Sequence, residues 1–161
     1  MSPEELPALF GAIRDLAASA AAPAATAMGK TMEAQVQREL KLTAHPPGIF
    51  WKAPPGRPPA YASGNLSRQT FATRASGEIR ATSTVGNTAI YSALQEFGGE
   101  TWPNRSAYMH WVNDRGSWFK KRVIVPEHPY FRPALEMVIA DGSLQGSAME
   151  AFEARLSPAF A

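Results

Sequence analysis

The sequence predicts an α+β fold, in which an antiparallel sheet of two hairpins is flanked by N-terminal and C-terminal amphipathic helices, in a single domain over residues 1–161. Apolar residues recur at helical spacing near both ends of the chain. Strand-like runs joined by glycine turns fill its middle, and a proline-rich stretch follows the first helices. Hydrophobic residues occupy 45% of the 161 positions, so a chain of this length can bury a core.

Composition excludes several classes of function. The chain has no cysteine, so it can form neither a disulfide framework nor a thiolate metal site. No apolar run approaches the roughly 20 residues that span a bilayer, and the first residues lack the basic start of a signal peptide. We therefore expect a soluble protein with no membrane partner. The net charge of +2 is too small to indicate nucleic-acid binding through overall charge.

Residues 1–44 are predicted to form two amphipathic helices, over about 3–21 and 24–42. Pro23 separates them, although the alanines on both sides favour helix, and one kinked rod is the alternative. The apolar face of the first helix consists of Leu6, Leu9, Phe10, Ile13, Leu16 and Ala17. The apolar face of the second consists of Met28, Met32, Val36 and Leu40.

Residues 45–62 are rich in proline, which disfavours both helix and sheet pairing. We interpret this segment as a surface linker. Phe50 and Trp51 lie within it, and such apolar bulk is unusual in a mobile linker, so the alternative is an arm that docks on a neighbouring subunit.

The sheet region spans residues 63–131 and begins with a hairpin. Its strands are predicted over 66–75 and 78–85, joined by a turn at Ser76 and Gly77. Residues 88–97 then follow helical spacing, and we expect a short helix that is closed by Gly98 or Gly99.

A second hairpin is predicted over residues 106–125, with strands at 107–112 and 118–125 around a polar turn. We expect it to project from the domain. Residues 132–157 form the C-terminal helix, with Pro133 in its first turn and a break near Asp141 and Gly142.

The candidate catalytic groups do not form a recognisable motif. The histidines do not share a helical face as metal ligands would, and neither a nucleophile elbow nor a phosphate loop is present. We expect Glu96 to be exposed or paired with an arginine rather than to act as a general acid. We therefore predict no enzyme, no cofactor and no metal site. The groups considered were His45, His110, His128, Glu96, Asp114, Glu127, Ser63 and Ser67.

The second hairpin combines aromatic and basic residues. Such a mixture occurs on protein interfaces and in single-stranded nucleic-acid binders. We favour a protein contact. The alternatives are that the aromatic residues are ordinary core with a solvated basic rim, and that the hairpin recognises nucleic acid. Because three successive cations are hard to satisfy within one small domain, we expect the basic cluster to face either DNA or an acidic patch on another protein subunit. With the two aromatics of the proline-rich segment, the predicted interface consists of Phe50, Trp51, Tyr108, Trp111, Trp118, Phe119, Lys120, Lys121 and Arg122.

Three segments carry a resemblance to a known family: Ser63-Gly64-Asn65-Leu66-Ser67-Arg68-Gln69, Tyr91-Ser92-Ala93-Leu94-Gln95-Glu96-Phe97-Gly98 and Pro126-Glu127-His128-Pro129-Tyr130-Phe131-Arg132-Pro133-Ala134. Their order and content resemble the putative tail-component and neck proteins of long-tailed bacteriophages. The proline-rich segment is longer and stiffer than the family pattern. The matching residues are Gly64, Leu66, Tyr91, Glu96, Phe97, Gly98, Pro129, Phe131, Arg132 and Pro133.

These residues also have physical roles of their own. Glycines 64 and 98 permit backbone conformations that a side chain would strain. Phe97, Tyr130 and Phe131 are expected to be buried, and prolines 129 and 133 direct the chain into the last helix. We expect Phe131 and Leu135 to pack against Leu9, Phe10 and Ile13 of the first helix, and His110 and His128 to matter little for stability.

The resemblance implies a structural virion protein that is assembled in the host cytoplasm. It would form a ring, expected to be hexameric, at the neck or the head-proximal end of the tail. There it would complete the tail and join it to the head. Its partners would be neighbouring neck or tail-tube rings, with possible non-specific contact with DNA in the channel. The alternatives are a nucleic-acid-binding protein that uses hairpin 106–125 and a small enzyme built around His110.

Overall fold

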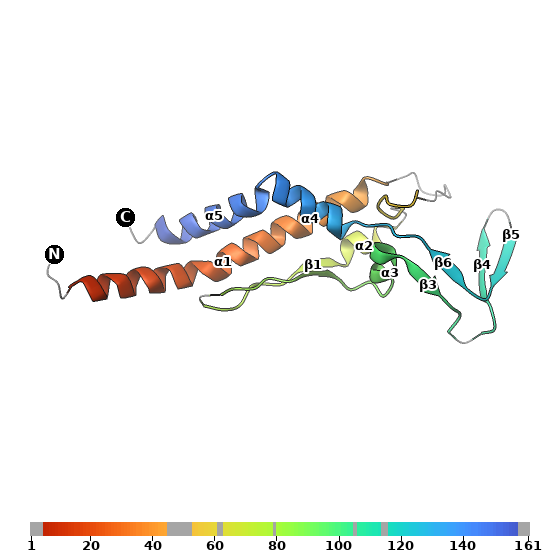
Figure 1. The fold of residues 1–161 in the computed structure, drawn as a ribbon, viewed down its shortest axis with the longest axis horizontal. Helices are drawn as coiled ribbons and strands as arrows, with labels where there is room; N and C mark the ends of the chain where they lie inside the picture. The colour runs from red at the N-terminus through yellow and green to blue at the C-terminus, as the bar shows by residue number, and fades with distance from the viewer. Residues whose placement is uncertain are drawn as a thin grey trace.

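The computed structural model describes residues 5–44, 53–60, 63–78, 80–104, 106–113 and 116–157. The molecule is elongated, as Figure 1 shows. A long helix runs along most of it, a helix pair from the C-terminal part lies along one side, and short strands lie on the other side and at one end. The α+β class is therefore confirmed. No helix in these ranges is long and apolar enough to cross a membrane.

The N-terminal region forms one continuous helix, α1, over Glu5–Lys41. The prediction of two helices is therefore wrong, and the single-rod alternative is closer to the structure. Pro23 lies inside α1, where it removes one backbone donor. The alanines on both sides favour helix strongly enough to continue it through that position.

The second half of α1 supplies the core. Met32, Val36 and Leu40 are buried together with residues of α4, which spans Phe131–Ala140. The helix α5, over Ser143–Leu156, packs along α1 from the same side (Figure 1). The predicted C-terminal helix and its break are thus confirmed. The core cluster consists of Met32, Val36, Leu40, Tyr130, Ala134 and Val138, flanked by the partly buried Leu66, Val85, Phe131 and Leu144.

The predicted docking of the C-terminal helix on the start of α1 is wrong. Leu9, Phe10 and Ile13 are 44%, 65% and 51% exposed, and Leu135 is also exposed. Phe131 packs instead against the cluster in the second half of α1. Helical spacing identified both apolar faces correctly, but it could not identify which face the C-terminal helix covers.

The first predicted hairpin is present but shorter than expected. Strand β1, Thr70–Ala72, pairs antiparallel with β2, Val85–Asn87, and an isolated bridge joins Ser76 to Thr82 near the predicted turn. The residues expected to open the first strand form a one-turn helix instead, α2, over Asn65–Arg68.

The second hairpin consists of β4, Met109–Asn113, and β5, Gly116–Lys120. The prediction that residues 123–125 continue this hairpin is wrong. They form β6, which pairs with β3, Gly99–Thr101. The predicted helix before β3 is confirmed as α3, Ser92–Phe97, and Gly98 follows it with φ 65°. The strands of the described ranges form separate two-stranded sheets rather than one continuous sheet.

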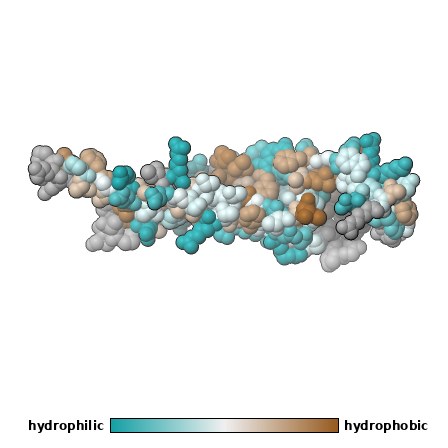
Figure 2. Space-filling model, turned by 90° about the horizontal axis from the view of Figure 1, so that it is seen from below, coloured by the Kyte–Doolittle hydropathy of each residue, from teal (hydrophilic) through white to brown (hydrophobic). Residues whose placement is uncertain are grey.

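The view from below in Figure 2 shows hydrophobic residues scattered in small patches along the molecule rather than gathered on one broad face. The larger exposed apolar groups belong to particular elements. They occur at the start of α1, on the projecting hairpin and on α4 and α5, and also at Leu42, Ile90, Phe97, Trp102 and Ile124.

Candidate functional site

The β4–β5 hairpin extends from one end of the molecule, away from the helices (Figure 1). Every residue of β5 is exposed, and because neighbouring strand residues point to opposite faces, both faces of β5 are accessible to solvent. Tyr108, Trp118 and Phe119 are 47%, 44% and 63% exposed. The predicted aromatic residues of the hairpin are therefore not core, insofar as their side chains are described.

One cross-strand pair organises the hairpin. His110 and Phe119 lie directly opposite each other, and their rings stack with centroids 4.4 Å apart and planes 10° from parallel. This stack contributes to hairpin stability. The next pair in the register is Trp111 with Trp118, but the Trp111 side chain lies outside what the structure describes. The arrangement gives His110 a structural role in the hairpin.

The basic cluster is partly neutralised within the chain. Arg122 pairs with Glu100, with Nη1 and Oε1 3.3 Å apart, and the Lys121 ammonium lies 5.7 Å from the centroid of the Tyr108 ring. The expectation that the domain could not accommodate these cations therefore fails for two of the three. Lys120, the last residue of β5, is exposed.

A second group of residues joins the three segments of the family resemblance. The Glu96 carboxylate accepts hydrogen bonds from the backbone N–H groups of Tyr130, Phe131 and Arg132, at 2.7, 3.0 and 3.1 Å. It thereby caps the N-terminus of α4, where a negative charge is favoured. We call this contact the Glu96 cap. Glu96 is only 6% exposed, so the prediction of a solvent-exposed or arginine-paired residue is wrong.

The sequence contains one clue to the Glu96 cap, which is that the start of α4 has no capping residue of its own. The residue before α4 is Tyr130, which makes no side-chain capping bond. A helix start without a serine, threonine, aspartate or asparagine still has free N–H groups to satisfy. A buried helix of this kind requires an acceptor from elsewhere in the chain, and Glu96 provides it from 34 residues upstream.

Other contacts tie the same segments together. The Asn65 amide donates to the Tyr91 hydroxyl at 2.7 Å, and Gly64 precedes α2 with φ 70°. Gly98 has no room for a side chain, because a Cβ there would lie 2.8 Å from the Glu127 nitrogen. The predicted roles of the two glycines are thus confirmed. Phe97 is 71% exposed, so its predicted burial is wrong.

The start of α4 carries the remaining residues of the resemblance. Pro133 occupies its first turn, as predicted. Tyr130 is fully buried and Phe131 is partly buried, and the exposed Arg132 pairs with Glu127 at 3.6 Å. Burial, followed by the nearby Glu96 carboxylate, raises the pKa of Tyr130 to about 12. Ser92 lies near the Tyr130 hydroxyl but outside hydrogen-bond geometry.

Part of the proline-rich segment packs on its own chain. The carbonyl of Pro59 accepts the Thr43 hydroxyl at 2.6 Å, the carbonyl of Glu127 accepts the Gly56 N–H at 3.0 Å, and His128 Nδ1 lies 3.0 Å from the Arg57 carbonyl oxygen. Residues 53–60 are therefore not a free linker. His128 is buried, contrary to the minor role that we predicted. Phe50 and Trp51 lie outside the described residues.

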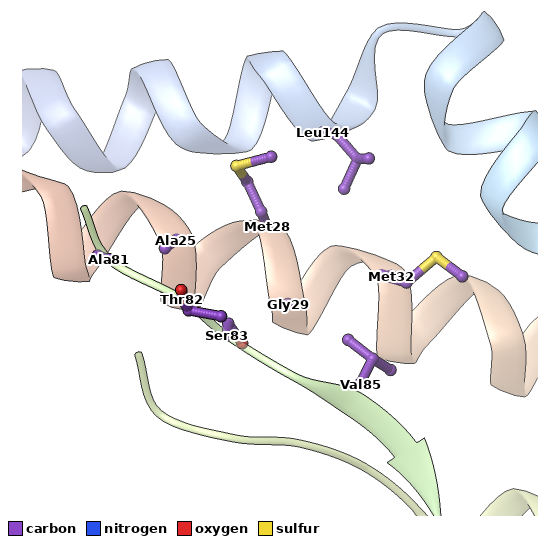
Figure 3. A pocket seen from close by; sticks show the side chains of 9 residues that line it. All are labelled: Ala25, Met28, Gly29, Met32, Ala81, Thr82, Ser83, Val85 and Leu144. Carbon is purple, nitrogen blue, oxygen red and sulfur yellow. The ribbon is translucent and has the colours of Figure 1, made fainter. Parts of the chain in front are cut away.

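A cavity of about 290 Å³ lies between α1, the end of α5 nearest α4 and the segment before β2. Figure 3 shows Leu144 reaching from α5 toward Met28 and Met32 on α1. The lining has hydroxyl groups but no titratable side chain, and the Ser83 hydroxyl already donates to the Thr73 carbonyl at 2.7 Å. The cavity therefore offers apolar contact and no acid–base group. Its lining residues are Ala25, Met28, Gly29, Met32, Ala81, Thr82, Ser83, Val85 and Leu144.

Within the described ranges, no group of three histidine, aspartate or glutamate residues could hold a metal ion. The structure thus brings together the residues of the resemblance around α3 and the start of α4. The aromatic and basic residues of the hairpin lie apart, at one end of the molecule. Comparison with known proteins found no matching family model, no matching curated protein and no matching solved structure.

Proposed function

We propose that this chain is a structural virion protein of a long-tailed phage. In this proposal, copies of the chain form a hexameric ring at the neck or the head-proximal end of the tail. The ring completes the tail and joins it to the head by contacting the neighbouring rings. DNA in the channel is contacted only without sequence preference, and the protein is not an enzyme.

One observation carries the proposal beyond the sequence resemblance. The three segments of the resemblance are far apart in the chain, yet Glu96 caps the helix that begins at Phe131, and Asn65 bonds to Tyr91. These hydrogen bonds link the three segments of the resemblance to one another in the fold. A family defined by such residues is defined by a scaffold rather than by a catalytic site, which fits a virion component.

The exposed apolar groups support self-assembly. Some of them lie near the two ends of the elongated molecule, on the start of α1 and on the β4–β5 hairpin (Figure 1), and others lie between the ends, on α4 and α5. Exposed aromatic and aliphatic groups on a protruding element are typical of protein contacts. Two separated surfaces of this kind allow each copy to contact two neighbours, and this is what a ring requires.

The test is the mass of the purified chain across a range of concentrations, by native mass spectrometry, with electron microscopy of the same sample. We expect closed rings of identical subunits with a central opening wide enough for duplex DNA. A chain that stays monomeric at all concentrations would overturn the proposal. If such a monomer also bound a single-stranded DNA probe, the nucleic-acid-binding alternative would replace it.

A further inference from the structure

We propose that the β4–β5 hairpin of one copy docks on the outer side of the α4–α5 helix pair of the next copy. This inference rests on the self-assembly in the proposed function and names the two surfaces that meet. We call them the hairpin surface, made of Tyr108, Trp118, Phe119, Lys120 and Lys121, and the helix surface, made of Leu135, Glu136, Ile139, Met149, Glu150 and Glu153.

The hairpin surface is poorly supported within its own chain. Strands β4 and β5 pair with each other only, in the part of the sheet region that the structure describes. A lone two-stranded hairpin is marginally stable in water at best. All five residues of β5 are exposed, Phe119 by 63%. A partner surface would stabilise the hairpin by burying those residues.

The charges of the two surfaces are complementary. On the hairpin side Lys120 and Lys121 are exposed, whereas the neighbouring Arg122 is already paired with Glu100. Residues 131–156, which include α4 and α5, carry Glu136, Asp141, Glu150 and Glu153 against Arg132 and Arg155, so four negative groups outnumber two positive ones. Opposite charges across an interface favour the correct partner and orientation. The same acidic residues would repel nucleic acid, so the helix surface suits a basic protein element.

The apolar parts of the two surfaces also match. Leu135 and Ile139 are one helical turn apart on α4 and are 44% and 56% exposed, while Met149 on α5 is 56% exposed. Aromatic residues and methionine are enriched at interface cores. Phe119, which is 63% exposed, would supply the aromatic group that the helix surface lacks.

The two surfaces cannot meet within one copy. The hairpin lies at one end of the molecule, and α5 runs toward the opposite end, where α1 begins (Figure 1). A contact between different surfaces of identical chains is head-to-tail, and repeated contacts of this type close into rings when the rotation allows. The occupant of the helix surface is therefore a second copy of this chain.

Charge reversal tests the contact. The hairpin variant carries Lys120→Glu and Lys121→Glu, and the helix variant carries Glu150→Lys and Glu153→Lys. Each variant alone should self-associate about tenfold or more weakly than the parent. An equimolar mixture of the two should recover assembly, because each reversed surface then meets a reversed partner and each unchanged surface meets an unchanged one. Self-association is measured by sedimentation, and folding is checked by circular dichroism.

Matched controls come from the loop between β1 and β2, where Arg74 and Glu78 are exposed. A variant with Arg74→Glu and Glu78→Lys should assemble as the parent does. If the parent forms rings and both charge-reversal variants assemble as well as the parent, the docking contact is overturned and the ring proposal remains. A monomeric parent would overturn both. If the parent forms open filaments that weaken in each variant and recover in the mixture, the docking contact is supported and the ring proposal is overturned. Weakened single-stranded DNA binding with unchanged self-association would assign the hairpin to nucleic acid.

Discussion

The two halves of α1 are built alike and buried differently. Both carry apolar residues at helical spacing on one face. In the second half Val36 and Leu40 are fully buried under α4, whereas in the first half Phe10 and Ile13 are more than half exposed. An apolar face thus predicts where a helix needs a neighbour. Whether the neighbour belongs to the same chain depends on where other elements can reach.

This difference assigns the two halves to different tasks. The second half holds the fold together, because it carries the cluster on which α4 packs. In the first half Ala20 is buried, but the large apolar residues from Leu6 to Ile13 are exposed and remain available for contact with another molecule. The following predictions test this division, from the largest expected effect to the smallest.

The largest effect is expected from Leu40→Ala. Leu40 is 1% exposed, so truncation should lower the free energy of unfolding by about 2–5 kcal/mol, through lost burial and the cavity left behind. Denaturant unfolding followed by circular dichroism measures the change. The matched control is Leu9→Ala, the same substitution in the exposed half. Equal losses for both variants would contradict the division of α1.

Glu96→Ala should follow, with a loss of about 2 kcal/mol. The substitution leaves the N–H groups of Tyr130, Phe131 and Arg132 without their shared acceptor. The control is Glu127→Ala, which removes only an exposed ion pair with Arg132 and should cost less than about 1 kcal/mol. A Glu96 variant as stable as this control would show that the cap does not hold α4 in place.

Alkaline pH should act through Tyr130, under α4. Its pKa in the folded protein is raised to about 12 from 10.0, mainly by burial. The folded state therefore holds the phenol proton more tightly than the unfolded state does. The stabilisation is fully present below pH 10.0 and is lost as the pH rises through about 12.

The substitution Tyr130→Phe isolates this effect. The free energy of unfolding of the parent should fall relative to that of the variant between pH 10 and 12. At neutral pH the variant should lose little, because the hydroxyl is buried without a hydrogen-bond partner among the described groups. Parallel stability curves over the alkaline range would show that the phenol is accessible to water in the folded state.

The smallest effect on the monomer is expected from Phe10→Ser. Phe10 is 65% exposed, so the free energy of unfolding should change by less than about 0.5 kcal/mol. If the first half of α1 is a contact surface, the same substitution should reduce self-association, which sedimentation measures. Ile90→Ser is the control, because Ile90 is fully exposed and lies outside α1. A large loss of monomer stability would show that Phe10 is packed.

Periodicity and turn chemistry predicted most of the local structure. The apolar face from Met32 to Leu40, the glycine after α3 and the hairpin around residues 113–116 were each visible in the sequence, because each depends on residues a few positions apart. The aromatic character of the hairpin was visible too. Tyr108, Trp118 and Phe119 are exposed in the folded chain, and their role as an interface stays a prediction.

The errors share a physical cause. The Glu96 cap, the pairing of β6 with β3 and the packing of residues 53–60 all join segments that are distant in the chain. Local spacing carries no information about such contacts. Phe97 is a further example of what local sequence does not show. As an aromatic residue in a motif it was predicted to be buried, but it is 71% exposed. Only the three-dimensional arrangement determines which face of α3 is covered.

The order in which the core is assembled has a consequence for synthesis on the ribosome. The buried face of α1 is translated early, but the elements that cover it follow about one hundred residues later, as the Gln35 to Met137 contact, 102 positions apart, illustrates. Until α4 emerges, Val36 and Leu40 have no covering partner from that helix. Nascent chains of this protein should therefore recruit chaperones that bind apolar segments, and release them only after α4 has left the exit tunnel.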